Sequence, residues 1–164
     1  YCLEDQSMFT GDEVQIYSEI PYSYYYDATG DARKREQALQ LLVNAKDDIF
    51  APAHDAAIVG SDFKDMIRLA IESHRHVEDL ILDTLIDGSV STDVIQEQME
   101  TALGLDWGEP YRSLINAHTA RAHLKKLAQD NEVTLLEKKH KKINRLKGHF
   151  MIVKVPGRGS VFLS

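Results

Sequence analysis

The first sixty residues combine short apolar runs, turn residues and one amphipathic segment. Residues 1–16 predict two strands around a glycine-containing turn. Asp31 is a favourable helix N-cap, and the leucines after it have a helical spacing that predicts a helix ending near Ala45. Residues 49–51 predict a short buried strand, because Pro52 ends the apolar run. Strands that alternate with a helix in this way are typical of an α/β fold.

The second part of the chain has a helical pattern of apolar residues. It predicts a long helix that Asp62 caps and that runs to about Ile86. A second helix is expected to begin after a cap at Ser91 or Thr92, and a third covers roughly residues 111–129. These three helices have little strand between them.

Strands return near the C-terminus. Residues 133–136 predict one strand, and residues 150–155 and 161–163 predict two more around a Pro-Gly-Arg-Gly turn. Three helices followed by a β-ribbon are typical of a winged helix, an α+β arrangement. We therefore predict two domains, residues 1–61 and residues 62–164.

Charge is distributed unevenly between these parts. Residues 1–100 carry 7 Lys/Arg against 21 Asp/Glu, a net charge of −14, whereas residues 101–164 carry 12 against 5, a net charge of +7. A basic half either meets phosphate backbones or attracts the acidic half. Both alternatives stay open at this point.

Two residues of the metal-ligand type follow predicted strands. Asp12 and His54 each lie in a turn, from which a side chain projects at the rim of a sheet, and carboxylate and imidazole both bind zinc. The alternatives are an Asx-turn role for Asp12 and a hydrogen-bonded surface position for His54. His74 and His76 point about 200° apart on a helix and cannot share one metal, so a solvated or interdomain helix face is expected there.

Several motifs resemble those of a known family. Phe-Thr-Gly-Asp at 9–12, Tyr-Tyr-Asp-Ala-Thr-Gly-Asp at 25–31 and Pro-x-His at 52–54 look like the C-terminal half of a metallo-β-lactamase-fold hydrolase, part of an αββα sandwich. Ser-His-Arg-His at 73–76 and Thr-Ala-Arg-Ala-His-Leu-Lys-Lys-Leu at 119–127 are similar to the winged-helix tail of one branch. That branch contains β-lactamase-like proteins and single-strand endoribonucleases.

The resemblance implies a dinuclear centre of zinc, or of iron or manganese. Asp12 matches the carboxylate that bridges the two ions, and His54 matches the last imidazole of the second ion. The chain has Pro-Ala-His-Asp at 52–55 where the family has Pro-Gly-His-Gly, and the family's His-x-His-x-Asp-His motif lies upstream of this sequence. Since zinc takes about four donors, we expect an incomplete or absent centre in this chain alone. No catalytic residue is assigned apart from the metal ligands.

Substrate and nucleic-acid candidates lie elsewhere. Tyr25 and Tyr26 are candidates for lining a substrate pocket, or they pack as an ordinary lid. Arg121, Lys125 and Lys126 are the nucleic-acid candidates, because the first two share a face of the third predicted helix. The alternative is a solvated basic surface.

Two hypotheses follow. The first is a C-terminal fragment of a hydrolase for esters, thioesters or phosphodiesters, and the second is a non-catalytic module that binds RNA or DNA or forms oligomers. The chain starts inside a strand-like run, so we expect a cut edge that pairs with the missing N-terminal half or with another copy, as in a homodimer. The lone Cys2 and the lack of an apolar run of about 20 residues favour a cytoplasmic protein without a membrane partner.

Overall fold

The computed structural model describes two compact units. It covers residues 6–11, 29–53, 56–86, 88–103, 111–137 and 151–154, and for residues 111–116, 137 and 151–154 it describes the backbone alone. The first unit comprises residues 1–24 and 32–76, and the second comprises residues 25–31 and 77–164. Helix α2 (Gly60–Thr84) is continuous and contributes to both. Within the described ranges, no helix has both the length and the apolar character needed to cross a bilayer.

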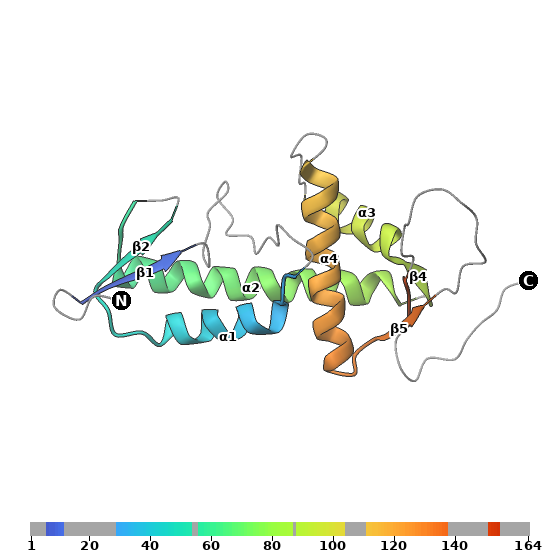
Figure 1. Ribbon diagram of the computed structural model, residues 1–164, viewed down its shortest axis with the longest axis horizontal. Helices are drawn as coiled ribbons and strands as arrows, with labels where there is room; N and C mark the ends of the chain where they lie inside the picture. Colours follow the sequence, from blue (N-terminus) through green and yellow to red (C-terminus); the bar gives the residue numbers. More distant parts are fainter. Residues whose placement is uncertain are drawn as a thin grey trace, which may run out of the picture. The chain divides into compact units, whose positions relative to one another are not determined.

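The first unit contains a three-stranded sheet in the order β1-β2-β3. Strands β1 (Ser7–Gly11) and β2 (Ile49–Pro52) lie side by side and parallel (Figure 1). Strand β3 (Ile58–Val59) pairs antiparallel with β2. Parallel neighbours need a long connection, and this one includes helix α1 (Ala32–Val43). The two parallel strands therefore end at the same edge of the sheet.

Helices α1 and α2 cover one face of this sheet. Phe50 of β2 stacks on Phe63 of α2 with ring centroids 3.9 Å apart and planes inclined by 7°, and neither side chain is exposed. Leu39 of α1 and Ile67 of α2 are fully buried in the same apolar cluster. Gly60 opens α2 where a Cβ atom would lie 3.0 Å from the backbone carbonyl of Asp47, so glycine permits this close approach.

The opposite face of the sheet is apolar and exposed. Side chains alternate across a strand, so Ile49, which precedes Phe50 in β2, points away from the helices, and so does Val59, its register partner in β3. Phe9, Ile49 and Val59 are 71%, 42% and 65% exposed. Three large apolar side chains on neighbouring strands therefore form one open surface.

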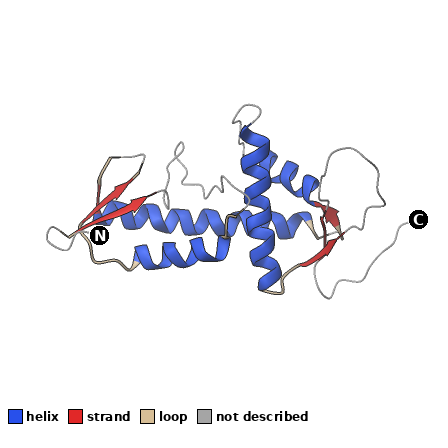
Figure 2. Ribbon diagram, viewed as in Figure 1, coloured by secondary structure: helices blue, strands red, loops and turns tan. Residues whose placement is uncertain are grey.

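The second unit combines helices with a small antiparallel sheet (Figure 2). After the end of α2, the elements are β4 (Val90–Ser91), α3 (Thr92–Leu103), α4 (Tyr111–Gln129), β5 (Thr134–Glu137) and β6 (Met151–Lys154). The strand order is β4-β6-β5, with both pairings antiparallel. The last strand thus lies between the other two.

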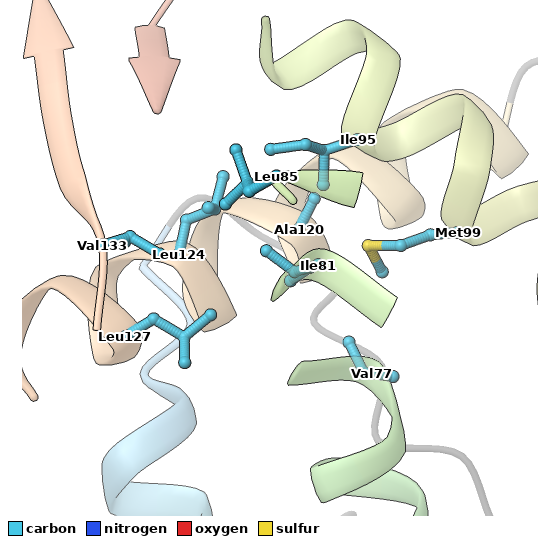
Figure 3. Close-up of a cluster of buried hydrophobic side chains, with 9 residues drawn as sticks. All are labelled: Val77, Ile81, Leu85, Ile95, Met99, Ala120, Leu124, Leu127 and Val133. Atoms are coloured by element: carbon cyan, nitrogen blue, oxygen red, sulfur yellow. The ribbon is translucent and has the colours of Figure 1, made fainter. Parts of the chain in front are cut away.

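A single apolar cluster holds α2, α3 and α4 together. Its side chains point toward one another in Figure 3, where Val77, Ile81, Leu85, Ile95, Met99, Ala120, Leu124, Leu127 and Val133 are labelled. Ile81, Ile95 and Leu124, one from each helix, are fully buried. Burial of a side chain of this size stabilises the fold by about 1.5–3 kcal/mol. This cluster fixes which faces of α2 and α4 meet.

Helix α4 ends in a Schellman motif. The N–H of Glu132 donates to the carbonyl of Leu127 over 2.9 Å, and the N–H of Asn131 donates to the carbonyl of Ala128 over 3.2 Å. Asn131 has φ of 62°, in the left-handed region that asparagine tolerates better than most residues. The turn leads the chain through the buried Val133 into β5.

Most predicted helices are confirmed, with local corrections. The third helix has the predicted bounds, but α2 begins at Gly60, so Asp62 lies in its first turn and does not cap it. Ser91 is the cap of α3, because its hydroxyl accepts from the N–H of Val94 at 3.4 Å. The predicted burial of the second strand is wrong for Ile49, which is 42% exposed.

The sequence pattern gave no indication of β4. A two-residue segment has no detectable period, and it becomes a strand because β6 pairs with it. The predicted strand at 150–155 matches β6, whereas the predicted strand at 161–163 lies outside the described residues.

Candidate metal-binding residues

Four predicted site residues lie outside the described part of the chain: Asp12, His54, Tyr25 and Tyr26. The residues directly before the two predicted metal ligands are described. The N–H of Ala53 donates to the carbonyl of Gly11 over 3.0 Å. Gly11 ends β1, and Ala53 follows the end of β2, the parallel neighbour of β1. The two chain segments therefore meet at one edge of the sheet.

The three basic candidates on α4 differ in exposure. Arg121 and Lys125 are exposed, whereas the side chain of Lys126 is 10% exposed. The ammonium nitrogen of Lys125 lies 3.8 Å from a carboxylate oxygen of Asp31. The burial of Lys126 favours an internal ion pair over a contact with solvent-borne phosphate.

Three side chains of the metal-ligand type gather on α2 and α4. His74, Glu78 and His123 each offer one ligand atom, and these atoms all lie within 4.8 Å of one another. His123 Nδ1 is 3.3 Å from Glu78 Oε1. His74 is 1% exposed, His123 is fully buried, and the side chain of Glu78 is 13% exposed. This group is buried, compact and chemically mixed.

Helical periodicity explains the contribution of each element. His74 and Glu78 are four residues apart on α2, so their side chains lie one above the other on one helix face. His123 and Lys126 are three residues apart on α4 and share a face in the same way. The apolar cluster shown in Figure 3 packs α2 against α4. Glu78 follows Val77 of this cluster and His123 precedes Leu124, and the side chains of Glu78 and His123 are in contact.

Glu78 is the electrostatic centre of this group. Lys126 Nζ lies 2.9 Å from Glu78 Oε2 and 3.4 Å from a carboxylate oxygen of Asp130. Burial alone raises the pKa of Glu78, but hydrogen bonds and positive charge from His123 and Lys126 outweigh it, so the pKa lies below its ordinary value. Glu78 is therefore a carboxylate at neutral pH.

The sequence contained only part of this arrangement. The prediction that His74 and His76 cannot share a metal is confirmed, because His74 is buried and His76 is exposed. The solvated interpretation of this helix face is wrong for His74. The spacing of His74 and Glu78 was a usable signal, since residues four apart share a helix face. Nothing local indicated His123, which lies 45 residues beyond Glu78.

Comparison with known proteins gives a likeness in fold. No family model matches the chain, and no curated protein matches it. Among solved structures, the chain is similar to a β-lactamase domain protein from Burkholderia ambifaria, with a TM-score of 0.58 and 15% sequence identity. The likeness covers 91% of this chain and 41% of that chain, so this chain spans less than half the length of the protein that it matches. The mixed α/β fold is thus consistent with part of a β-lactamase-like domain, and a likeness in fold does not by itself assign an activity.

Proposed function

We propose that the chain is part of a metal-dependent hydrolase of the metallo-β-lactamase superfamily, in which Asp12 and His54 help to hold two divalent metal ions. The hydrogen bond between Ala53 and Gly11 is the observation that carries this proposal. Gly11 and Ala53, the residues that directly precede the two proposed ligands in the sequence, thus meet at one edge of the sheet. The fold likeness to a β-lactamase domain protein supports the same assignment.

The proposed ligands fit a metal centre but do not complete one. A bridging carboxylate and an imidazole are suitable donors for zinc, iron or manganese, yet a zinc ion takes about four. The remaining donors then belong to a segment outside this sequence. Zinc, when bound, lowers the pKa of a bound water to near 7, which suits hydrolysis of an ester, thioester or phosphodiester.

The exposed apolar face of the β1-β2-β3 sheet is evidence that the first unit packs against a partner. Phe9, Ile49 and Val59 form an apolar surface of the kind that a second sheet covers in a two-sheet sandwich. We propose that the missing N-terminal half covers it, and a second copy of the chain is the competing occupant. Sedimentation of the chain with and without the upstream segment separates the two.

An activity assay tests the hydrolase proposal. The protein is produced with its upstream coding segment and assayed with zinc on ester, thioester and phosphodiester substrates. Asp12→Asn and His54→Asn should each reduce hydrolysis to the rate of the metal-free protein. The control Glu72→Gln removes an exposed carboxylate of α2 and should keep the wild-type rate. Full activity in both ligand variants would refute the proposal.

We further propose that residues 62–164 form a winged-helix-like domain that binds nucleic acid. The element order β4-α3-α4-β5-β6 and the strand order β4-β6-β5 support this, and Arg121 and Lys125 lie exposed one turn apart on α4. Helices at this position meet nucleic acid in related folds.

The salt dependence of single-stranded RNA binding tests the second proposal. Affinity should fall steeply with salt, and Arg121→Gln with Lys125→Gln should reduce the slope of log K against log salt by about 1–2. An affinity that is insensitive to salt or to both substitutions would contradict it.

A further inference from the structure

The buried group on α2 and α4 has the composition of a metal site. Two imidazoles and one carboxylate, from His74, His123 and Glu78, present ligand atoms within 4.8 Å of one another. All three residues lie on helices, which hold side chains more firmly than loops do. None of them belongs to the centre proposed for Asp12 and His54. They therefore form a separate candidate site.

The spacing of the ligand atoms fits a small divalent cation. With zinc bonds of about 2.0–2.1 Å and tetrahedral angles, two ligand atoms on one zinc ion lie about 3.3 Å apart. His123 Nδ1 and Glu78 Oε1 are separated by 3.3 Å. His74 offers the third ligand atom, and the ligand atoms of the three residues all lie within 4.8 Å of one another. Two histidines and one carboxylate are one of the zinc ligand sets that leave a fourth position open.

The two carboxylate oxygens of Glu78 face different partners. Lys126 holds Oε2 at 2.9 Å, while Oε1 is the oxygen that faces His123. Lys126 is itself held by Asp130 at 3.4 Å, so its ammonium is balanced by two carboxylates. Contacts of this kind orient a ligating carboxylate in metal proteins.

We propose that His74, Glu78 and His123 form a binding site for one zinc ion, distinct from the site of Asp12 and His54. Zinc takes the place of a proton at Nδ1 of His123, because that nitrogen and Glu78 Oε1 otherwise share a hydrogen bond. Binding therefore releases protons. The ion links α2 to α4 next to the apolar cluster of the second unit.

Zinc titration of the chain tests this site. The chain with Asp12→Asn and His54→Asn serves as the background, so that the other proposed centre does not contribute. Calorimetry should show one zinc ion bound, with a heat that depends on the ionisation enthalpy of the buffer. His74→Asn or His123→Asn should weaken binding at least tenfold.

Matched controls lie on the same helix. His76→Asn removes an exposed imidazole two residues from His74, and Glu72→Gln removes an exposed carboxylate six residues from Glu78. Both controls should bind zinc within twofold of the background protein. Equal losses in the His74 and His76 variants would overturn the proposal, as would a background protein that binds no zinc.

A measurement on the unsubstituted side chains covers variants that fail to fold. Nitrogen-15 spectra of the imidazoles in the background protein should show zinc-induced shifts at His74 and His123 and none at His76. Shifts confined to exposed histidines would refute the site. Loss of zinc binding at Asp12 and His54 alone leaves these spectra unchanged, so failure of the two proposals is distinguishable.

Discussion

The ion pair of Glu78 and Lys126 should be strongly coupled in a double-mutant cycle. The perturbations are Glu78→Gln and Lys126→Met, which remove each charge and nearly preserve side-chain volume. At 2.9 Å and an effective dielectric constant of about 20, two unit charges attract by on the order of 6 kcal/mol, and desolvation offsets much of this. With side chains only 13% and 10% exposed, we expect a coupling free energy of about 1–3 kcal/mol.

Each single substitution should cost more than the coupling alone. Lys126→Met leaves Glu78 without its ammonium partner and also removes the contact with Asp130, so a loss of about 3 kcal/mol is expected. The double variant should lose less than the sum of the two single variants. Urea unfolding, followed by circular dichroism at pH 7, gives all four free energies of unfolding.

The neighbouring lysine provides the control cycle. Lys125 Nζ lies 3.8 Å from Asp31 Oδ2, and the side chain of Lys125 is 56% exposed. A cycle of Lys125→Met and Asp31→Asn should therefore show a coupling free energy of about 0.2–1 kcal/mol, which added salt weakens. Asn retains the capping ability of Asp at residue 31. If the Glu78–Lys126 cycle is additive within about 0.5 kcal/mol, the buried pair does not stabilise the second unit and the reasoning fails.

Three further predictions concern pH and backbone geometry. Folding lowers the pKa of Glu78, so the ionised carboxylate stabilises the fold above the ordinary pKa of 4.5, and this stabilisation is lost as the pH falls below that value. The unfolding midpoint should therefore fall more between pH 7 and pH 3 in the wild type than in Glu78→Gln. Parallel curves for the two proteins would refute this. Asn131→Ala should cost about 1–2 kcal/mol in urea unfolding because φ is 62°, whereas Asn131→Gly should be nearly neutral; equal effects would contradict the left-handed cap. Gly60→Ala should destabilise the first unit by about 1–3 kcal/mol, since its Cβ would lie 3.0 Å from the carbonyl of Asp47, and an unchanged thermal midpoint would show that the backbone yields.

Local chemistry in the sequence determined the helices. The bounds of α4 follow from a proline before Tyr111 and an asparagine at the left-handed position after Gln129. The opposite directions of His74 and His76 follow from the 100° rotation per residue of any α-helix. Such features depend on a few neighbouring residues, so they are readable before the chain folds.

Tertiary packing decided which side chains meet. Lys126 is predicted to contact nucleic acid or to belong to a solvated basic surface, yet the apolar face around Leu124 and Leu127 turns it toward Glu78 and buries it. Glu78 and His123 lie 45 residues apart, and no local period relates them. The strand character of β4 likewise depends on β6, more than fifty residues later by its bounds. The sequence thus determined the helices and which residues share a helix face. The contact between the faces of α2 and α4, which forms the candidate zinc site, required tertiary packing, because the burial of a side chain depends on the whole unit.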